Sequence, residues 1–121
     1  MGAKIKGAGS SQIEIEGVKQ LKDVSYNIMS DRIEAGTFLC IEAMNHSNII
    51  VKNIDEDHII PIIDKLEEAG CELQIEDRQI QIKAPKKLKS ANIKTKPYPG
   101  FPTDMQSIFA TLLTTAKGSS I

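Results

Sequence analysis

The residue best suited to bind a ligand or take part in a reaction is Asp104, which follows the Pro- and Gly-rich stretch Pro99–Thr103. No charged side chain occurs between Asp104 and Lys117. A helix without charge over about three turns is typical of a buried element. An acid at the mouth of such a helix can meet a ligand, where its carboxylate would accept a hydroxyl hydrogen bond or act as a general base.

A structural role for Asp104 remains open beside the chemical one. An anion in the first turn interacts favourably with the helix dipole, and Thr103 with Gln106 would form a Thr-x-x-Gln capping box. Asp31 shows the same arrangement, because Glu34 follows it three residues later and Arg32 stands beside it. Both aspartates are therefore candidates for a cap and for a ligand contact.

Other reactive residues give weaker signals. Cys40 and Cys71 stand in apolar settings without CxxC or metal-type spacing, which predicts buried thiols in a reducing compartment. His46 and His58 have no partner at metal-ligand spacing. We expect no metal site and no cofactor.

Composition narrows the function classes. The 121 residues fit one small domain or a piece of a larger one, and 15 basic against 16 acidic side chains give a net charge of −1. That balance provides no global attraction to nucleic acid or membrane. No signal peptide or apolar run of spanning length is visible, so we expect a cytoplasmic protein.

The first half of the chain alternates strands and helices. Strict alternation predicts a strand over Gln12–Glu16, and Tyr26–Met29 reads as a weaker one. A helix should begin at Asp31, and a strand should cover Asn48–Lys52. The expected apolar stripe of the helix consists of Ile33, Thr37, Cys40, Ile41 and Met44.

The next helix should end at Gly70 and begin at Asp55 or Asp57, with Asp57 favoured because Pro61 then lies in the first turn. Its predicted apolar stripe is Ile59, Ile62, Ile63 and Leu66. A hairpin around Asp77-Arg78, a strand over Ala91–Thr95 and a helix over about Thr103–Ala116 follow.

From Tyr26 to Lys83 the predicted order is β-α-β-α-β-β. We therefore divide the chain into the tail strands of a preceding repeat (1–25), a complete βαβαββ repeat (26–90) and the start of the next repeat (91–121). The first and third predicted helices are nearly uncharged, whereas the strands alternate apolar and charged residues. This pattern predicts an α/β (α+β) fold with helices inside and a sheet that has one face in water.

Two stretches, Asp31–Leu39 and Pro99–Gln106, resemble signature segments of the UDP-N-acetylglucosamine enolpyruvyl transferase (1-carboxyvinyltransferase) family. Ile13–Val18 and Glu68–Cys71 fit the same family in order and spacing. The resemblance runs along nearly the whole chain. It implies an inside-out α/β barrel fragment, because the family fold has two domains of three βαβαββ repeats each.

The resemblance also implies an activity. The family transfers enolpyruvyl from phosphoenolpyruvate to the 3-hydroxyl of UDP-N-acetylglucosamine in the first step of peptidoglycan synthesis. It assigns Asp104 as the carboxylate that binds this hydroxyl and acts as base, and Thr103 as a neighbour that touches the sugar. Asp31 matches an acid of the active cleft with a less certain role.

This chain covers well under half of such an enzyme and lacks the cysteine loop and the phosphate-binding arginines. We therefore expect a central fragment that is inactive alone and that self-associates through uncovered repeat edges. The alternative is a stand-alone βαβαββ module that binds RNA or an acidic partner through the basic segment Lys83–Lys96. No aromatic residue interrupts this segment, which counts against base stacking.

Overall fold

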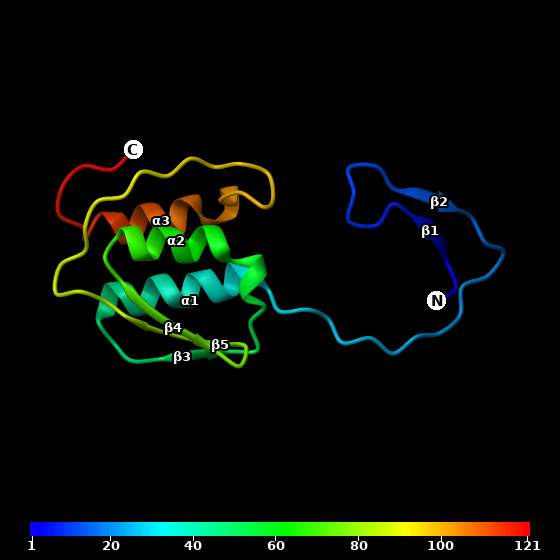
Figure 1. Ribbon diagram of the computed structural model, residues 1–121, viewed down its shortest axis with the longest axis horizontal. Coiled ribbons are helices and arrows are strands. Elements are labelled where there is room, and N and C mark those ends of the chain that lie inside the picture. Colours follow the sequence, from blue (N-terminus) through cyan, green and yellow to red (C-terminus); the bar gives the residue numbers. More distant parts are fainter.

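The computed structural model describes residues 1–121 and begins with a small hairpin. Strands β1 (Lys4–Lys6) and β2 (Glu14–Glu16) are antiparallel, and Ile5 pairs with Ile15. The hairpin stands apart from the rest of the protein at the end of an extended connection (Figure 1). The predicted strand is therefore confirmed in its second half only.

The connection over residues 17–31 contains no regular strand, so the strand predicted over Tyr26–Met29 is wrong. Tyr26, Ile28 and Met29 are 73%, 87% and 63% exposed. A strand requires a neighbour for its backbone groups, and no element lies beside this segment. The observed order after residue 26 is α-β-α-β-β, and the proposed repeat boundaries remain predictions.

Helix α1 (Arg32–Asn45) begins at the predicted cap and ends at His46, whose φ of 52° is left-handed. Its inward face is rotated from the predicted stripe, because Ile41 is 44% exposed and Cys40 alone of that stripe is fully buried. The buried residues of the helix are Ala35, Gly36, Leu39, Cys40, Glu42 and Ala43.

Glu42 is a buried charge-bearing side chain in α1, with no exposed surface. Its Oε2 accepts hydrogen bonds from the Ser47 hydroxyl and the Ile49 N–H, both at 2.9 Å, whereas Oε1 has no partner. A buried carboxylate is tolerated only where it is hydrogen-bonded. Glu42 therefore ties α1 to the loop that leads into strand β3 (Ile50–Lys52).

Helix α2 (Ile60–Glu68) follows a short 3₁₀ turn, η1 (Glu56–His58). Pro61 lies in the first turn as expected, but the predicted cap is wrong because Ile59 occupies the N-cap and no side chain caps the helix. The aspartates fall in and before the 3₁₀ turn instead. The apolar stripe is confirmed, since all four of its residues are buried, and Gly70 ends the helix with a φ of 97°.

Strands β4 (Glu72–Glu76) and β5 (Gln79–Lys83) form the predicted hairpin. Asp77 and Arg78 have φ values of 48° and 58°, the left-handed pair of a tight type I′ turn. The sheet order is β3-β5-β4 with both pairings antiparallel. Ile80 and Ile82 of β5 are buried while the alternate residues are not, so the sheet has one face in water.

The strand predicted over Ala91–Thr95 is wrong, because the segment makes one isolated bridge, from Thr95 to Phe101, and scattered hydrogen bonds. The chain continues into a second 3₁₀ turn, η2 (Thr103–Met105), and helix α3 (Gln106–Leu113), which is shorter than predicted. Only Phe109 and Leu112 of α3 are fully buried. A helix without charges is thus half exposed in this chain.

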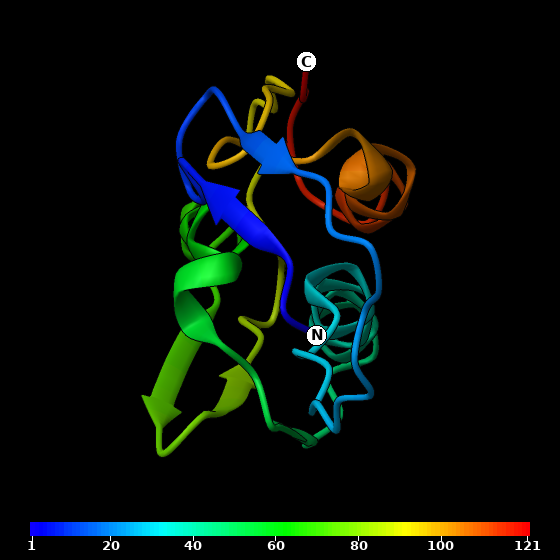
Figure 2. The same cartoon turned by 90° about the vertical axis from the view of Figure 1, so that its right-hand side faces the viewer.

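Helix α1 packs against α3 on one side and against β3 and β5 on the other, while α2 packs on β4. Figure 2 shows the helices gathered around a common centre with the sheet at one edge. A core of 18 buried residues includes side chains from α1, α2, β5 and α3, and Val51 of β3 and Leu73 of β4 pack against it. No helix is both long and apolar enough to cross a membrane.

Candidate functional site

The loop before Asp104 closes on itself. The Lys96 N–H donates to the Phe101 carbonyl at 3.0 Å, and the Gly100 N–H donates to the Pro97 carbonyl at 2.8 Å. A Cβ on Gly100 would lie 2.5 Å from the Lys96 Cβ, a distance that no two side chains tolerate. The short loop therefore requires glycine at this position.

Phe101 anchors the end of this loop in the core. It is 5% exposed, and its ring meets Phe109 of α3 edge to face, with the centroids 5.4 Å apart and the planes at 89°. Such aromatic pairs stabilise by about 0.5–1.5 kcal/mol beyond the area they bury. The backbone that carries Asp104 is thus fixed to α3 immediately before the 3₁₀ turn.

Asp104 lies in the middle of η2 and is exposed, as is Thr103. The predicted capping box is wrong: Pro102 occupies the N-cap, and no side-chain cap bond forms. The reason is that Thr103 already lies inside the turn, which closes with the Met105 N–H donating to the Pro102 carbonyl at 3.1 Å. Thr103 and Asp104 are therefore two exposed, adjacent residues at the start of this segment.

These two residues line a polar depression together with cationic side chains from other segments. Arg32 enters it from the first turn of α1, and its guanidinium carbon lies 5.1 Å from the centre of the Tyr98 ring. The lining residues are Arg32, Thr95, Lys96, Pro97, Tyr98, Pro102, Thr103 and Asp104. Two cations and one carboxylate around an open depression suit a polar ligand that carries negative charge and hydroxyl groups.

Arg32 was not singled out as a site residue from the sequence. It stands next to Asp31 in the motif that carries the family resemblance, which is the signal that could have found it. The sequence could not show that the first turn of α1 reaches the loop near Tyr98.

Asp31 caps α1 as predicted. Its Oδ1 accepts from the Ile33 N–H at 2.7 Å and from the Glu34 N–H at 3.3 Å. Asp31 lines a different depression, together with Glu34, Lys52 and Asn53. The structure therefore does not bring Asp31 into the depression of Asp104, although its neighbour Arg32 lies there.

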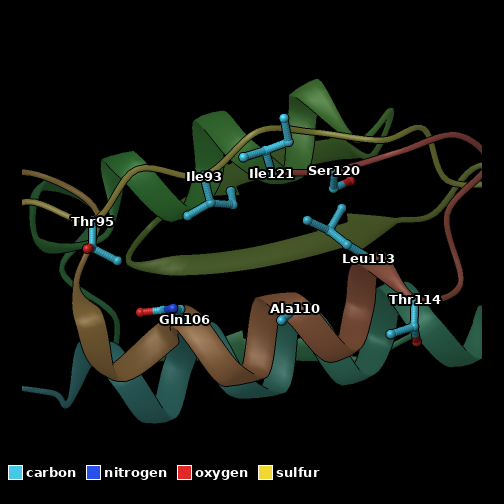
Figure 3. A pocket seen from close by; sticks show the side chains of 8 residues that line it. All are labelled: Ile93, Thr95, Gln106, Ala110, Leu113, Thr114, Ser120 and Ile121. Carbon is cyan, nitrogen blue, oxygen red and sulfur yellow. The ribbon is translucent and has the colours of Figure 1, made fainter.

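A third depression lies along the exposed side of α3 (Figure 3). Gln106, Ala110 and Leu113 line it from the helix, and Ile93 and Ile121 face them across the gap. This depression is more apolar than the one at Asp104 and contains no charged side chain.

The cysteines are free and buried, as predicted. Burial raises the pKa of Cys40 to about 12, with a smaller contribution from nearby Cys71, and burial raises the pKa of Cys71 to about 11. Both are therefore neutral thiols near pH 7, and a thiolate is the reactive form. No three His, Cys, Asp or Glu side chains converge as a metal site.

Comparison with known proteins places this geometry in a family. The family model for EPSP synthase (3-phosphoshikimate 1-carboxyvinyltransferase) matches residues 1–121. UDP-N-acetylglucosamine 1-carboxyvinyltransferase of Geotalea daltonii is 46% identical over 121 residues, which is 100% of this chain and 29% of that protein. UDP-N-acetylglucosamine 1-carboxyvinyltransferase 1 of Caldanaerobacter subterraneus subsp. tengcongensis is 47% identical over 121 residues, again 100% of this chain and 29% of that protein.

A solved structure supports the fold independently. The enolpyruvyl transferase NikO from Streptomyces tendae superposes with a TM-score of 0.74 and 22% identity, covering 97% of this chain and 29% of that one. This chain thus spans less than a third of the length of either 1-carboxyvinyltransferase. Nothing in these matches supports the alternative of an RNA-binding module. The chain belongs to the EPSP synthase family, and its helices and sheet correspond to part of the enolpyruvyl transferase barrel.

Proposed function

We propose that this chain supplies the Asp104-bearing portion of a UDP-N-acetylglucosamine 1-carboxyvinyltransferase. The observation that carries the proposal is the 46% identity to a protein of that name, which extends over the whole chain. Such an enzyme transfers enolpyruvyl from phosphoenolpyruvate to the sugar 3-hydroxyl and so starts peptidoglycan synthesis for the cell wall. UDP-N-acetylglucosamine is its sugar partner.

Asp104 is the proposed catalytic carboxylate. The transfer forms a bond between the sugar 3-oxygen and the enol carbon of phosphoenolpyruvate and releases phosphate, so the hydroxyl proton must go to a base. Asp104 is exposed at the amino end of the η2–α3 segment, where the helix dipole favours a carboxylate. Thr103 beside it is the proposed sugar contact.

The cations of the depression have a role in the same proposal. Arg32 and Lys96 line it with Asp104, and positive charge there attracts the phosphate groups of both substrates. Asp31 remains a proposed acid of the cleft with a secondary role. Both backbone N–H groups that it caps donate to Oδ1, so neither cap bond occupies Oδ2.

We further propose a cytoplasmic location, with no nucleic acid or membrane as partner. Strands β3 and β4 are the outer strands of their sheet, and an unpaired strand edge is a template for pairing with another chain. Self-association through these edges is therefore the expected partner interaction of the isolated chain.

The test is a chimera in which these 121 residues replace the matching section of the Geotalea daltonii relative. We expect phosphate release that depends on both phosphoenolpyruvate and UDP-N-acetylglucosamine. Asp104→Asn should abolish it, whereas Asp57→Asn, an exposed aspartate in the other 3₁₀ turn, should not. A folded chimera that releases no phosphate, or an Asp104→Asn variant of full activity, would refute the proposal.

The isolated chain should release no phosphate from the same substrates. Its acid lies in an open, solvated depression, and productive geometry requires both substrates to be held in place. Turnover by the isolated chain that disappears in Asp104→Asn would show that these residues suffice.

A further inference from the structure

Gly36 is a glycine in the first half of α1, where nothing in the backbone requires one. Its φ is not positive, and glycine inside a helix costs about 0.5–1 kcal/mol relative to alanine. Gly36 is also fully packed, since it is among the buried residues of the helix. A close approach by another segment is therefore the physical reason to look for.

That segment is the turn that carries Asp104. A Cβ built on Gly36 would lie 2.9 Å from the Met105 Cε and 3.1 Å from its Sδ, and also 2.9 Å from the Ile62 Cδ1 of α2. Met105 has no exposed surface, so its side chain cannot move aside into solvent. The missing side chain of Gly36 is what allows Met105 to lie directly on α1.

Met105 follows Asp104 in the chain, and its N–H closes the 3₁₀ turn on Pro102. The side chain that packs on Gly36 and the carboxylate of Asp104 are therefore attached to the same short turn. Helix α1 also contacts the loop before Asp104, because Arg32, one turn before Gly36, lies over the Tyr98 ring. Asp104 thus lies in a segment that α1 contacts on both sides, at Tyr98 and at Met105.

We propose that Gly36 is a positioning residue for Asp104, because the absence of a side chain there sets how closely the Asp104 turn approaches α1. This inference rests on the proposed function for its catalytic meaning, but its structural content can be measured without activity. Gly36 is not among the residues that line the Asp104 depression, and it acts only through Met105.

The first test is the NMR spectrum of the 121-residue chain. Gly36→Ala should shift the amide and carboxyl signals of Asp104, whereas the control Gly17→Ala should not, since a Cβ there meets nothing within 4 Å. Adding Met105→Val, which removes Sδ and Cε, should bring the Asp104 signals back toward their original positions. Adding Ile62→Val, which relieves only the contact with α2, should leave the Asp104 signals at their shifted positions.

If Gly36→Ala does not fold, the double variants decide the question. Recovery of folding by Met105→Val but not by Ile62→Val supports the proposal, and the reverse pattern overturns it. Unshifted Asp104 signals in a folded Gly36→Ala chain overturn it too.

In the chimera, Gly36→Ala should lower kcat for phosphate release at least tenfold while KM for UDP-N-acetylglucosamine changes less than threefold. Met105→Val should restore part of kcat. If Ile62→Val restores kcat as much as Met105→Val does, the loss comes from general packing of α1, and the proposal is overturned. An inactive parent chimera counts against the proposed function alone, because the NMR result is independent of it.

Discussion

The guanidinium of Arg32 lies over the ring of Tyr98, with 5.1 Å from its central carbon to the ring centre. This pair links the first turn of α1 to the loop before Asp104, far along the chain. It forms one wall of the depression that contains Thr103 and Asp104. The first turn that Asp31 caps is therefore connected to the proposed base through a neighbour rather than by Asp31 itself.

Tyr98→Leu should remove this contact and lower the free energy of unfolding by about 0.5–1 kcal/mol, the range for an exposed cation–π pair. Urea denaturation of the purified chain measures it. Tyr26→Leu is the matched control, because Tyr26 is 73% exposed and lies in the connection that forms no helix or strand. A loss of the same size in both variants would mean that the Arg32–Tyr98 pair contributes nothing.

Glu42→Ala should lower the free energy of unfolding by about 1–3 kcal/mol, because it leaves the half-buried Ile49 N–H without its acceptor. Glu42→Gln should cost much less, since its amide oxygen can replace the accepting Oε2. The measurement is chemical denaturation of both variants beside Glu67→Ala, an exposed glutamate of α2. Equal losses in Glu42→Ala and Glu67→Ala would show that the hydrogen bonds from Glu42 to the loop before β3 do not stabilise the fold.

Arg78→Gly should stabilise the chain. Arg78 has a φ of 58° in the turn between β4 and β5, and glycine adopts this region without the steric cost of a side chain. We expect a gain of about 0.5–1 kcal/mol, measured as an increased urea midpoint. Gln79→Gly, the next residue and already inside β5, should destabilise, and a stabilising result there would point to a loose hairpin instead.

Stability should fall at high pH because of the two cysteines. Burial raises the pKa of Cys40 from 9.0 to about 12 and that of Cys71 to about 11. The unfolded chain therefore loses these protons near pH 9 while the folded chain keeps them. Their contribution is complete below pH 9 and is lost as the pH rises through the folded values.

Denaturation midpoints at pH 8, 9, 10 and 11 measure this effect. The chain in which both cysteines are changed to alanine is the control, because tyrosines and lysines also titrate in this range. We expect a steeper decline in the original chain than in the double variant. Parallel declines would mean that the thiols are accessible in the folded state.

The sequence was most informative where residue chemistry and local geometry coincide. Asp31 as a cap, Pro61 in a first turn, Gly70 at a helix end and the turn at Asp77-Arg78 all follow from backbone rules that need no partner. The apolar stripe of α2 was also predictable, since this helix has one strongly apolar side.

Prediction failed where a distant neighbour decides the outcome. Tyr26–Met29 has strand character but no strand beside it, and α1 buries the side of Gly36 and Glu42 because α3 and the sheet lie there. Thr103 could not be placed inside the turn before the position of Phe101 was known. The same limitation hid Arg32, whose proximity to Tyr98 depends on how α1 meets the loop.

The sheet order β3-β5-β4 and the contact of α1 with α3 also constrain the sequence of events during folding. The hairpin β4–β5 joins neighbouring residues and can form early, whereas Met105 can settle on Gly36 only after the intervening chain has closed a long loop. We therefore expect Asp104 to reach its final orientation among the last steps of folding. A partly folded chain would contain the acid but no organised site around it.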